Sequence, residues 1–180
     1  MNDEKKHINP FGAINKNIQQ SNVTPKYIKP DGTKVFEEDT PAGKIVYEAM
    51  PNGTLISMTY DKNGVLIMDY ARRVNYEIGH IYDELGKKVY EFNNYYDENN
   101  TFVRKNEIGY DYYDEGEMSR ETIISTPGDV RIEISYDREG NQTEKVEIKG
   151  SVKTWFDVNG KPIKRQIDRG SGGIITENLD

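Results

Sequence analysis

A five-residue pattern that begins with an aromatic residue and an aspartate recurs along the chain and limits how it can fold. The copies read aromatic-Asp-x-x-Gly or a close variant, and they start at Tyr60, Tyr82, Tyr96, Tyr113, Tyr136 and Phe156. Aspartate at the first position of a type I turn accepts the backbone N–H two residues later, and glycine at the fourth position adopts a positive φ without steric cost. Each copy therefore predicts a tight hairpin turn, with the aromatic ring closing the strand that enters it.

Two copies depart from this pattern. Asn100 stands where the other copies have glycine, and asparagine is the next best residue at positive φ. The copy at Tyr113 is one residue shorter than the others, which predicts a turn of a different kind at that point.

The segments between the turns alternate β-branched or aromatic residues with polar ones, as at Val130, Ile132, Ile134 and Tyr136. Strands joined by short turns pair antiparallel, because parallel pairing needs long crossovers. Apolar residues such as Trp155 and Phe156 are adjacent and so face opposite sides of a strand, which favours a thin sheet over a two-sheet sandwich. The sequence predicts an all-β fold over residues 27–168, an antiparallel meander of repeated β-hairpins that forms an elongated, twisted or partly closed sheet.

The two ends differ from this region. Residues 1–26 are rich in Asn and Gln and are predicted to be a disordered or partner-ordered arm. Asn9-Pro10-Phe11 would suit a small peptide-binding domain, whereas Ile8, Phe11 and Ile14 would alternatively pin the arm to the body. Residues 169–180 are predicted to be a flexible C-terminal tail, with Gly170-Ser171-Gly172-Gly173 as a hinge.

Charge and targeting signals restrict the partners and the compartment. The chain has 24 Lys and Arg against 31 Asp and Glu, a net charge of −7, which argues against a nucleic-acid partner. A charged N-terminus without an apolar run behind it lacks the pattern of a secretory signal, and no apolar run is long enough to span a membrane. The expected compartment is the cytoplasm, with a virion or export without a cleaved signal left open.

The sequence offers little reactive chemistry. The absence of Cys excludes disulfides, thiolate metal sites and cysteine nucleophiles. His80 has acidic residues near it in sequence, including Glu77 and Asp83, but no Gly-x-Ser-x-Gly motif accompanies it. The acidic turns, such as Asp97 to Asn100, are either solvated turns or a calcium site that uses oxygen ligands, although the EF-hand spacing is absent. We expect no enzyme activity, no cofactor and no catalytic or metal-ligating residues.

The turn pentads resemble the YD repeats of the RHS group, best at Tyr60-Asp61-Lys62-Asn63-Gly64 and Tyr136-Asp137-Arg138-Glu139-Gly140. A looser resemblance is to MORN-like repeats, and it covers about residues 54–165. The Arg that usually follows the repeat glycine is replaced here, for example by Val65. The chain is also too short for the closed shell that long RHS proteins form. The resemblance implies a β-hairpin building block and brings no catalytic residues with it.

A non-catalytic β-repeat module for protein–protein binding or assembly is the expected function. The partner would be another protein or a second copy, held by the sheet face or an edge strand, since unpaired edge strands invite another chain. The candidate binding residues are the pentad aromatics, Tyr60, Tyr82, Tyr96, Tyr113, Tyr136 and Phe156. One alternative is an acidic immunity or inhibitor protein that masks a basic toxin. The other is a carbohydrate-binding domain that uses the same aromatic strip.

Overall fold

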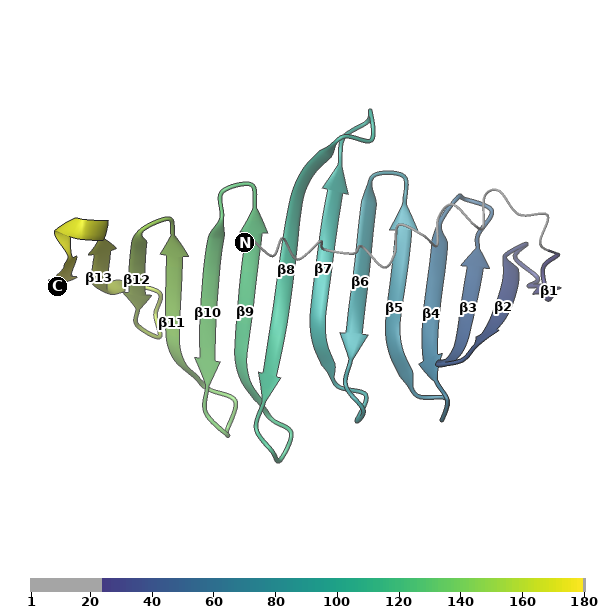
Figure 1. The fold of residues 1–180 in the computed structure, drawn as a ribbon, viewed down its shortest axis with the longest axis horizontal. Helices are drawn as coiled ribbons and strands as arrows, with labels where there is room; N and C mark the ends of the chain where they lie inside the picture. The colour runs from purple at the N-terminus through teal and green to yellow at the C-terminus, as the bar shows by residue number, and fades with distance from the viewer. Residues whose placement is uncertain (1–23, 180) are drawn as a thin grey trace.

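The computed structural model describes residues 24–179 and folds them into one antiparallel sheet of fourteen strands in chain order (Figure 1). The strands are β1 (Tyr27–Ile28), β2 (Lys34–Thr40), β3 (Gly43–Ala49), β4 (Leu55–Asp61), β5 (Leu66–Arg73), β6 (Tyr76–Tyr82), β7 (Lys88–Tyr96), β8 (Phe102–Tyr112), β9 (Met118–Thr126), β10 (Val130–Tyr136), β11 (Gln142–Lys149), β12 (Val152–Phe156), β13 (Pro162–Asp168) and β14 (Ile174–Asn178). A short 3₁₀ helix, η1 (Gly170–Gly172), lies between the last two strands. The predicted all-β meander is confirmed, and its sheet is open because β1 and β14 do not pair with each other.

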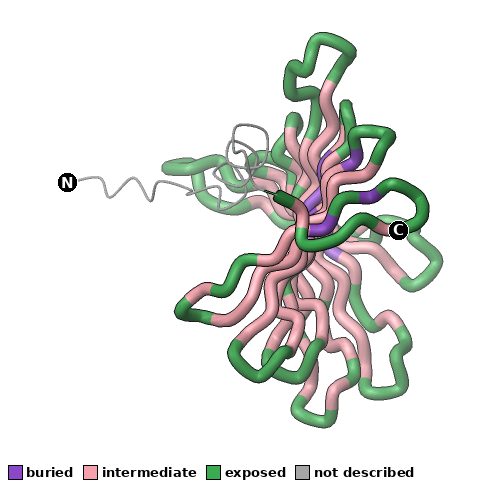
Figure 2. Tube along the Cα trace, turned by 90° about the vertical axis from the view of Figure 1, so that its right-hand side faces the viewer, coloured by how far each residue is buried: buried purple, intermediate pink, exposed green. Residues whose placement is uncertain are grey.

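The sheet is a single twisted layer. Seen along its long axis, the strands fan around a common centre, with most buried residues close to this centre and exposed residues at the turns (Figure 2). Within residues 24–179 the buried hydrophobic side chains are Val35, Tyr70, Phe92 and Val146. Most strand residues on both faces are half-buried, so their side chains pack against neighbours in the same layer.

One turn geometry joins nine of the thirteen successive strand pairs. In each, the first residue of the turn donates its N–H to the carbonyl of the fifth, and the fourth donates to the carbonyl of the first. In the β4–β5 turn these bonds are Asp61 N to Val65 O at 2.9 Å and Gly64 N to Asp61 O at 3.1 Å. Gly64 has a φ of 82° there, as a glycine at this position of the hairpin requires. The turn therefore fixes which residues face each other across every such hairpin.

The turn at Tyr113 corrects the prediction of a different connection. Tyr113 N donates to Glu117 O and Gly116 N donates to Tyr113 O, both at 2.9 Å, which is the common turn geometry. Tyr113 occupies the position that aspartate holds in other copies, and Tyr112 is the aromatic residue at the strand end, paired with Met118. The backbone bonds do not require the aspartate, since Gly116 supplies the positive φ of 107°.

The C-terminal segment also corrects its prediction. Residues 169–173 form a hydrogen-bonded turn in place of a hinge, and residues 174–178 form β14, which pairs with residues 164–168 of β13. Asp168 Oδ1 accepts the Gly170 N–H at 2.7 Å, and this bond orders the glycine-rich turn. The predicted flexible tail is therefore the last hairpin of the sheet.

The predicted N-terminal arm falls largely on residues 1–23, outside the described residues. Its last residue, Lys26, belongs to the sheet. The Lys26 N–H donates to Val35 O at 2.8 Å, and its ammonium is 2.5 Å from Glu37 Oε2.

A small apolar cluster lies at the middle of the sheet. Tyr70 and Phe92 are buried, and Met68 and Tyr90 pack against them. Gly79 lies directly between these two buried rings in the strand register, paired with Tyr70 on one side and Phe92 on the other. A Cβ at Gly79 would lie 2.4 Å from Phe92 Cε1, so the Phe92 ring occupies the space that a side chain would take.

Replacing Gly79 by alanine is therefore expected to destabilise the sheet by overpacking, by about 1–3 kcal/mol. Gly109 is the matched control, since it also lies in a strand and a Cβ there would meet nothing within 4 Å. The free energy of unfolding in urea, followed by circular dichroism, checks this. Equal free energies for Gly79→Ala and Gly109→Ala would show that the Phe92 ring moves aside without cost.

Candidate protein-binding surface

The aromatic turns divide between the two ends of the strands. The rows of turns at these ends form the upper and lower edges of the sheet in Figure 1, which are distinct from the edge strands β1 and β14. Five of the six pentads lie at the β4–β5, β6–β7, β8–β9, β10–β11 and β12–β13 turns, all on the lower edge in Figure 1. The pentad at Tyr96 lies on the opposite edge, because only β7 separates it from the turn at Tyr82. It belongs to the β7–β8 hairpin, which extends beyond its neighbours (Figure 1). The structure therefore brings five of the predicted binding residues to one edge and separates Tyr96 from them.

The hydroxyl groups of these tyrosines are hydrogen-bonded within the sheet. Tyr82 donates to Asp69 Oδ2 at 2.6 Å, Tyr96 to Glu77 Oε2 at 2.9 Å, Tyr113 to Tyr136 O at 2.8 Å and Tyr136 to Glu121 Oε2 at 3.3 Å. Tyr60 contacts Met58 Sδ at 3.5 Å, and Lys145 Nζ lies 5.3 Å from the centre of the Phe156 ring. All six rings are half-buried. The rings therefore link neighbouring parts of the sheet and leave only part of their surface for a partner.

The turn aspartates have the structural role that the pattern predicts. Asp61 Oδ1 accepts the N–H groups of Asn63 and Val65, both at 2.8 Å, and Asp83, Asp97 and Asp157 make the same pair of bonds in their turns. The Asn141 N–H similarly lowers the pKa of Asp137.

His80 is part of a polar cluster at mid-sheet. Its Nδ1 is 2.7 Å from Asp69 Oδ1, and its Nε2 is 3.6 Å from Glu91 Oε2. Asp69 and Glu91 face His80 from the two neighbouring strands. Glu77, which is close to His80 in sequence, pairs with Arg72 and projects from the other face of the sheet, since odd and even residues of a strand alternate. Asp69 and Glu91 were not predicted as neighbours of His80. Counting residues back from the turn at Val74-Asn75 and forward from the turn after Tyr82 places them opposite it.

The contacts within this cluster favour the ionised form of Glu91 and the neutral form of Tyr82. Although burial opposes it, the Lys88 ammonium and the Asn93 amide lower the pKa of Glu91, and their distances to its carboxylate oxygens are 2.6 and 2.9 Å. Burial and the hydrogen bond to Asp69 raise the pKa of Tyr82 to about 12. An Asp–His pair is the orienting part of a catalytic triad, but the group that faces His80 Nε2 is a carboxylate and has no hydroxyl to activate.

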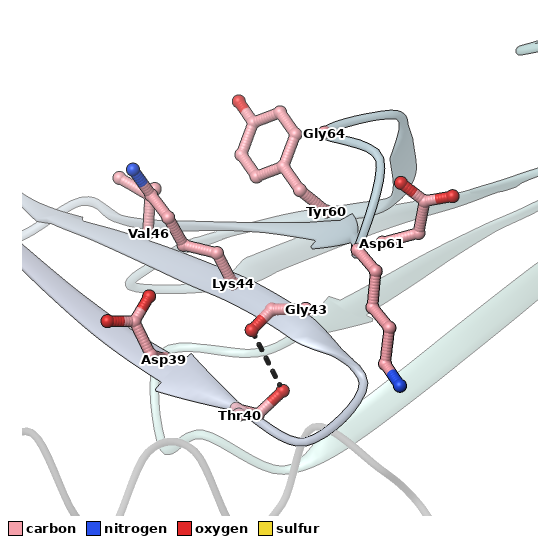
Figure 3. Close-up of a pocket in the computed structure, with 9 residues that line it drawn as sticks. Asp39, Thr40, Gly43, Lys44, Val46, Tyr60, Asp61 and Gly64 are labelled. Carbon is pink, nitrogen blue, oxygen red and sulfur yellow. Dashed lines mark hydrogen bonds between the residues drawn. The ribbon is translucent and has the colours of Figure 1, made fainter.

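An open hollow of about 590 Å³ lies where the β2–β3 and β4–β5 turns meet (Figure 3). Its lining residues are Asp39, Thr40, Gly43, Lys44, Val46, Tyr60, Asp61, Lys62 and Gly64. Gly43 allows the two turns to approach closely, since a Cβ there would lie 2.1 Å from Tyr60 O. Thr40 Oγ1 donates to Gly43 O at 3.2 Å (Figure 3), and Asp61 is already bonded within its own turn. The hollow thus offers a recess beside the turns, in which Thr40 and Asp61 are bonded within their own turns and Lys44 pairs with Glu37.

β14 presents an unpaired edge. Arg169 N donates to Gly173 O at 3.0 Å and Leu179 N donates to Ile163 O at 2.9 Å, so every second residue between them bonds to β13. The residues between, Ile174, Thr176 and Asn178, therefore direct their N–H and C=O groups away from β13. No strand among residues 24–179 pairs with this side of β14, and Ile174 is 67% exposed. The sequence predicts binding at an edge strand, whereas it predicts a flexible tail for residues 169–180.

Charge is segregated along the sheet. Residues 107–144 hold eleven carboxylates and three arginines, whereas residues 145–169 hold seven Lys and Arg and three carboxylates. Within residues 24–179, every ion pair between Lys or Arg and a carboxylate lies among residues 26–138. Lys153 and Lys164 instead lie over the Trp155 ring, each 4.7 Å from its centre.

Residues 24–179 contain no group of three or more His, Asp or Glu side chains arranged to hold a metal ion. In the same residues, no helix has the length and apolar character needed to cross a membrane.

No protein-family model matches the chain, and no curated protein matches it. The resemblance to YD and MORN-like repeats therefore stays a prediction.

The raised pKa of Tyr82 predicts a loss of stability in alkali. The folded state keeps this phenol protonated up to a pKa of about 12, whereas an unfolded tyrosine ionises near 10. Its contribution is therefore complete below about pH 10 and is lost as the pH rises towards 12. We expect Tyr82→Phe to make urea unfolding less dependent on pH in this range.

Asp69→Asn is the companion variant, because it keeps the Tyr82 ring and removes the carboxylate that accepts its hydrogen bond. Ultraviolet titration of tyrosinate should show one phenol ionising at lower pH in this variant. An unchanged titration curve would mean that Asp69 does not influence Tyr82.

Proposed function

We propose that the protein is a non-catalytic β-sheet module that binds another protein by strand addition at β14. The observation that carries this proposal is the row of outward N–H and C=O groups on Ile174, Thr176 and Asn178. A strand laid along this row would gain backbone hydrogen bonds without any rearrangement of the sheet.

β14 has few of the features that protect an edge strand, which supports the same proposal. Natural edge strands are kept from pairing by short length, bulges, proline or charged side chains, and β14 has one charged residue, Glu177. β14 has five residues, Ile-Ile-Thr-Glu-Asn, and pairs with β13 without a register shift. β1, at the other edge, has only two residues. The two edges therefore differ, and β14 is the one suited to accept a partner strand.

Thr176→Pro tests this function. Thr176 directs its N–H away from β13, so proline removes a donor for the partner strand and no backbone bond of the sheet, and edge strands tolerate proline. The one side-chain bond lost, from Gln166 Nε2 to Thr176 Oγ1 at 3.4 Å, is also lost in the valine control described below. Peptides selected from a random display library on the immobilised protein are expected to bind Thr176→Pro at least about tenfold more weakly, since a backbone hydrogen bond is lost and the ring obstructs pairing.

Thr176→Val is the matched control, because valine keeps the N–H and the β-branched shape. It should bind the selected peptides within about twofold of the original protein. Thermal unfolding of both variants verifies that the sheet is intact. Peptides that bind Thr176→Pro as tightly as the original chain would exclude strand addition at β14.

The acidic segment of residues 107–144 favours a second candidate function, the masking of a basic partner protein. Asp114, Glu117 and Glu139 are exposed on the β8–β9 and β10–β11 turns, which share one edge of the sheet. None of the three forms an ion pair with a described residue. A concentration of free carboxylates on one edge would steer a cationic protein towards it.

Glu117→Gln combined with Glu139→Gln tests this candidate against Glu98→Gln combined with Asp129→Asn, which removes the same charge from the exposed β7–β8 and β9–β10 turns on the opposite edge. For a small basic protein that binds the chain, the first pair should slow association by about tenfold at low salt, and the second should not. Equal effects of the two pairs would assign the attraction to net charge alone.

A further inference from the structure

We infer that the strand which adds to β14 is β14 of a second copy, in antiparallel register with Thr176 opposite Thr176. This inference rests on the proposed function, because it names the occupant of the same edge. The two sheets would continue into each other across a two-fold axis normal to the sheet, and the interface would be self-complementary.

The register follows from the direction of the backbone groups. Ile174, Thr176 and Asn178 direct their N–H and C=O groups outward, so these residues must face their counterparts in a bonded pair. Pairing centred on Thr176 uses all three residues in both copies. It places Ile174 of one copy opposite Asn178 of the other, and Thr176 opposite Thr176.

The side chains are compatible with this register. Ile175 faces Glu177 of the second copy, so no two like charges are directly opposed, and opposed like charges are what destabilises cross-strand pairs. Thr176 against Thr176 is a favourable cross-strand pair. A register shifted by two residues would place Glu177 opposite Glu177 or leave the end of the strand unpaired.

The charged residues of the neighbouring strand do not oppose this register. Lys164 of β13 pairs with Asn178, and Asp168 pairs with Ile174. In the proposed register Asn178 faces Ile174 of the second copy, so one row across the interface carries Lys164 of one copy and Asp168 of the other. These opposite charges are separated by three strand spacings, about 14 Å, so their attraction is weak and screened by salt.

β1 is excluded as the partner of β14 by its length. It offers two residues, Tyr27 and Ile28, and pairs with β2 only over these. A five-residue edge would leave most of its outward groups unbonded against β1. Pairing of β14 with itself bonds the whole edge and closes the assembly at two copies.

The contact is small. Two five-residue strands bury less than the roughly 1,200 Å² that stable interfaces need. We therefore expect weak association, and a covalent trap is the appropriate measurement. The chain has no cysteine, so a single introduced thiol reports on one position alone.

Thr176→Cys is the central variant. Directly opposed residues in a bonded antiparallel pair have Cα atoms about 5.5 Å apart, which lies within the range that a disulfide spans. Under mild oxidation the full chain is expected to form a disulfide dimer about tenfold faster than Ser171→Cys, an exposed thiol in the β13–β14 turn.

The register has its own test. Ile174→Cys and Asn178→Cys should each crosslink slowly alone and quickly when mixed, because residue 174 of one copy faces residue 178 of the other. Crosslinking of Thr176→Cys at the rate of Ser171→Cys would overturn the inference. If Thr176→Pro nevertheless abolished peptide binding, strand addition at β14 would stand and only its occupant would change.

Discussion

The backbone hydrogen bonds between neighbouring strands are the interaction on which this molecule depends. A β-sandwich gains much of its stability by burying two apolar faces against each other, but residues 24–179 form one layer. Few side chains are fully buried, and they include Val35 and Val146 in strands and Thr33 beside the β1–β2 turn. Each strand is therefore held by the strands beside it, as in other repeat arrays where a unit contacts only its neighbours.

Side chains that reach across strands replace the missing second layer. Tyrosine, lysine and glutamate have long apolar parts that cover the sheet and polar ends that stay near water. Tyr82 reaches Asp69, and Tyr90 reaches Glu107, each on a neighbouring strand. Tyr112 of β8 likewise crosses to neighbouring β7, where it donates to Lys88 O at 2.6 Å. This use of amphipathic residues explains how a chain with 34% hydrophobic residues and 13 tyrosines forms an ordered sheet.

The hairpins were predictable because their signal is local. Aspartate and glycine at fixed spacing determine a turn without reference to the rest of the chain, and the turns at Asp61 and Asp157 form as expected. Short connections such as Pro41-Ala42 and Val74-Asn75 lack that signal, yet they decide which edge each later turn occupies. The common edge of the Tyr60 and Tyr82 turns, and the contact of His80 with Asp69, depend on the Val74-Asn75 connection and were not evident from the sequence.

β14 was missed for a related reason. Its turn has Arg169 where other copies have aspartate and four small residues after it, so composition indicated flexibility. The turn is ordered by three backbone bonds and by Asp168, one residue before the expected position. A strand at the end of a sheet also gains its stability from a single neighbouring strand. A turn pattern of five consecutive residues gives no sign of this pairing.

The chain order of the strands has a mechanical consequence. Because β1 and β14 lie at opposite ends of the sheet, tension applied between the two ends acts across the strands and not along them (Figure 1). Under such a load the bonds of one strand pair open one after another, which needs less force than shearing them together. Each hairpin of about 20 residues that peels away would lengthen the chain by roughly 65 Å. The molecule would thus behave as an extensible tether that yields in steps and refolds from whatever part of the sheet remains.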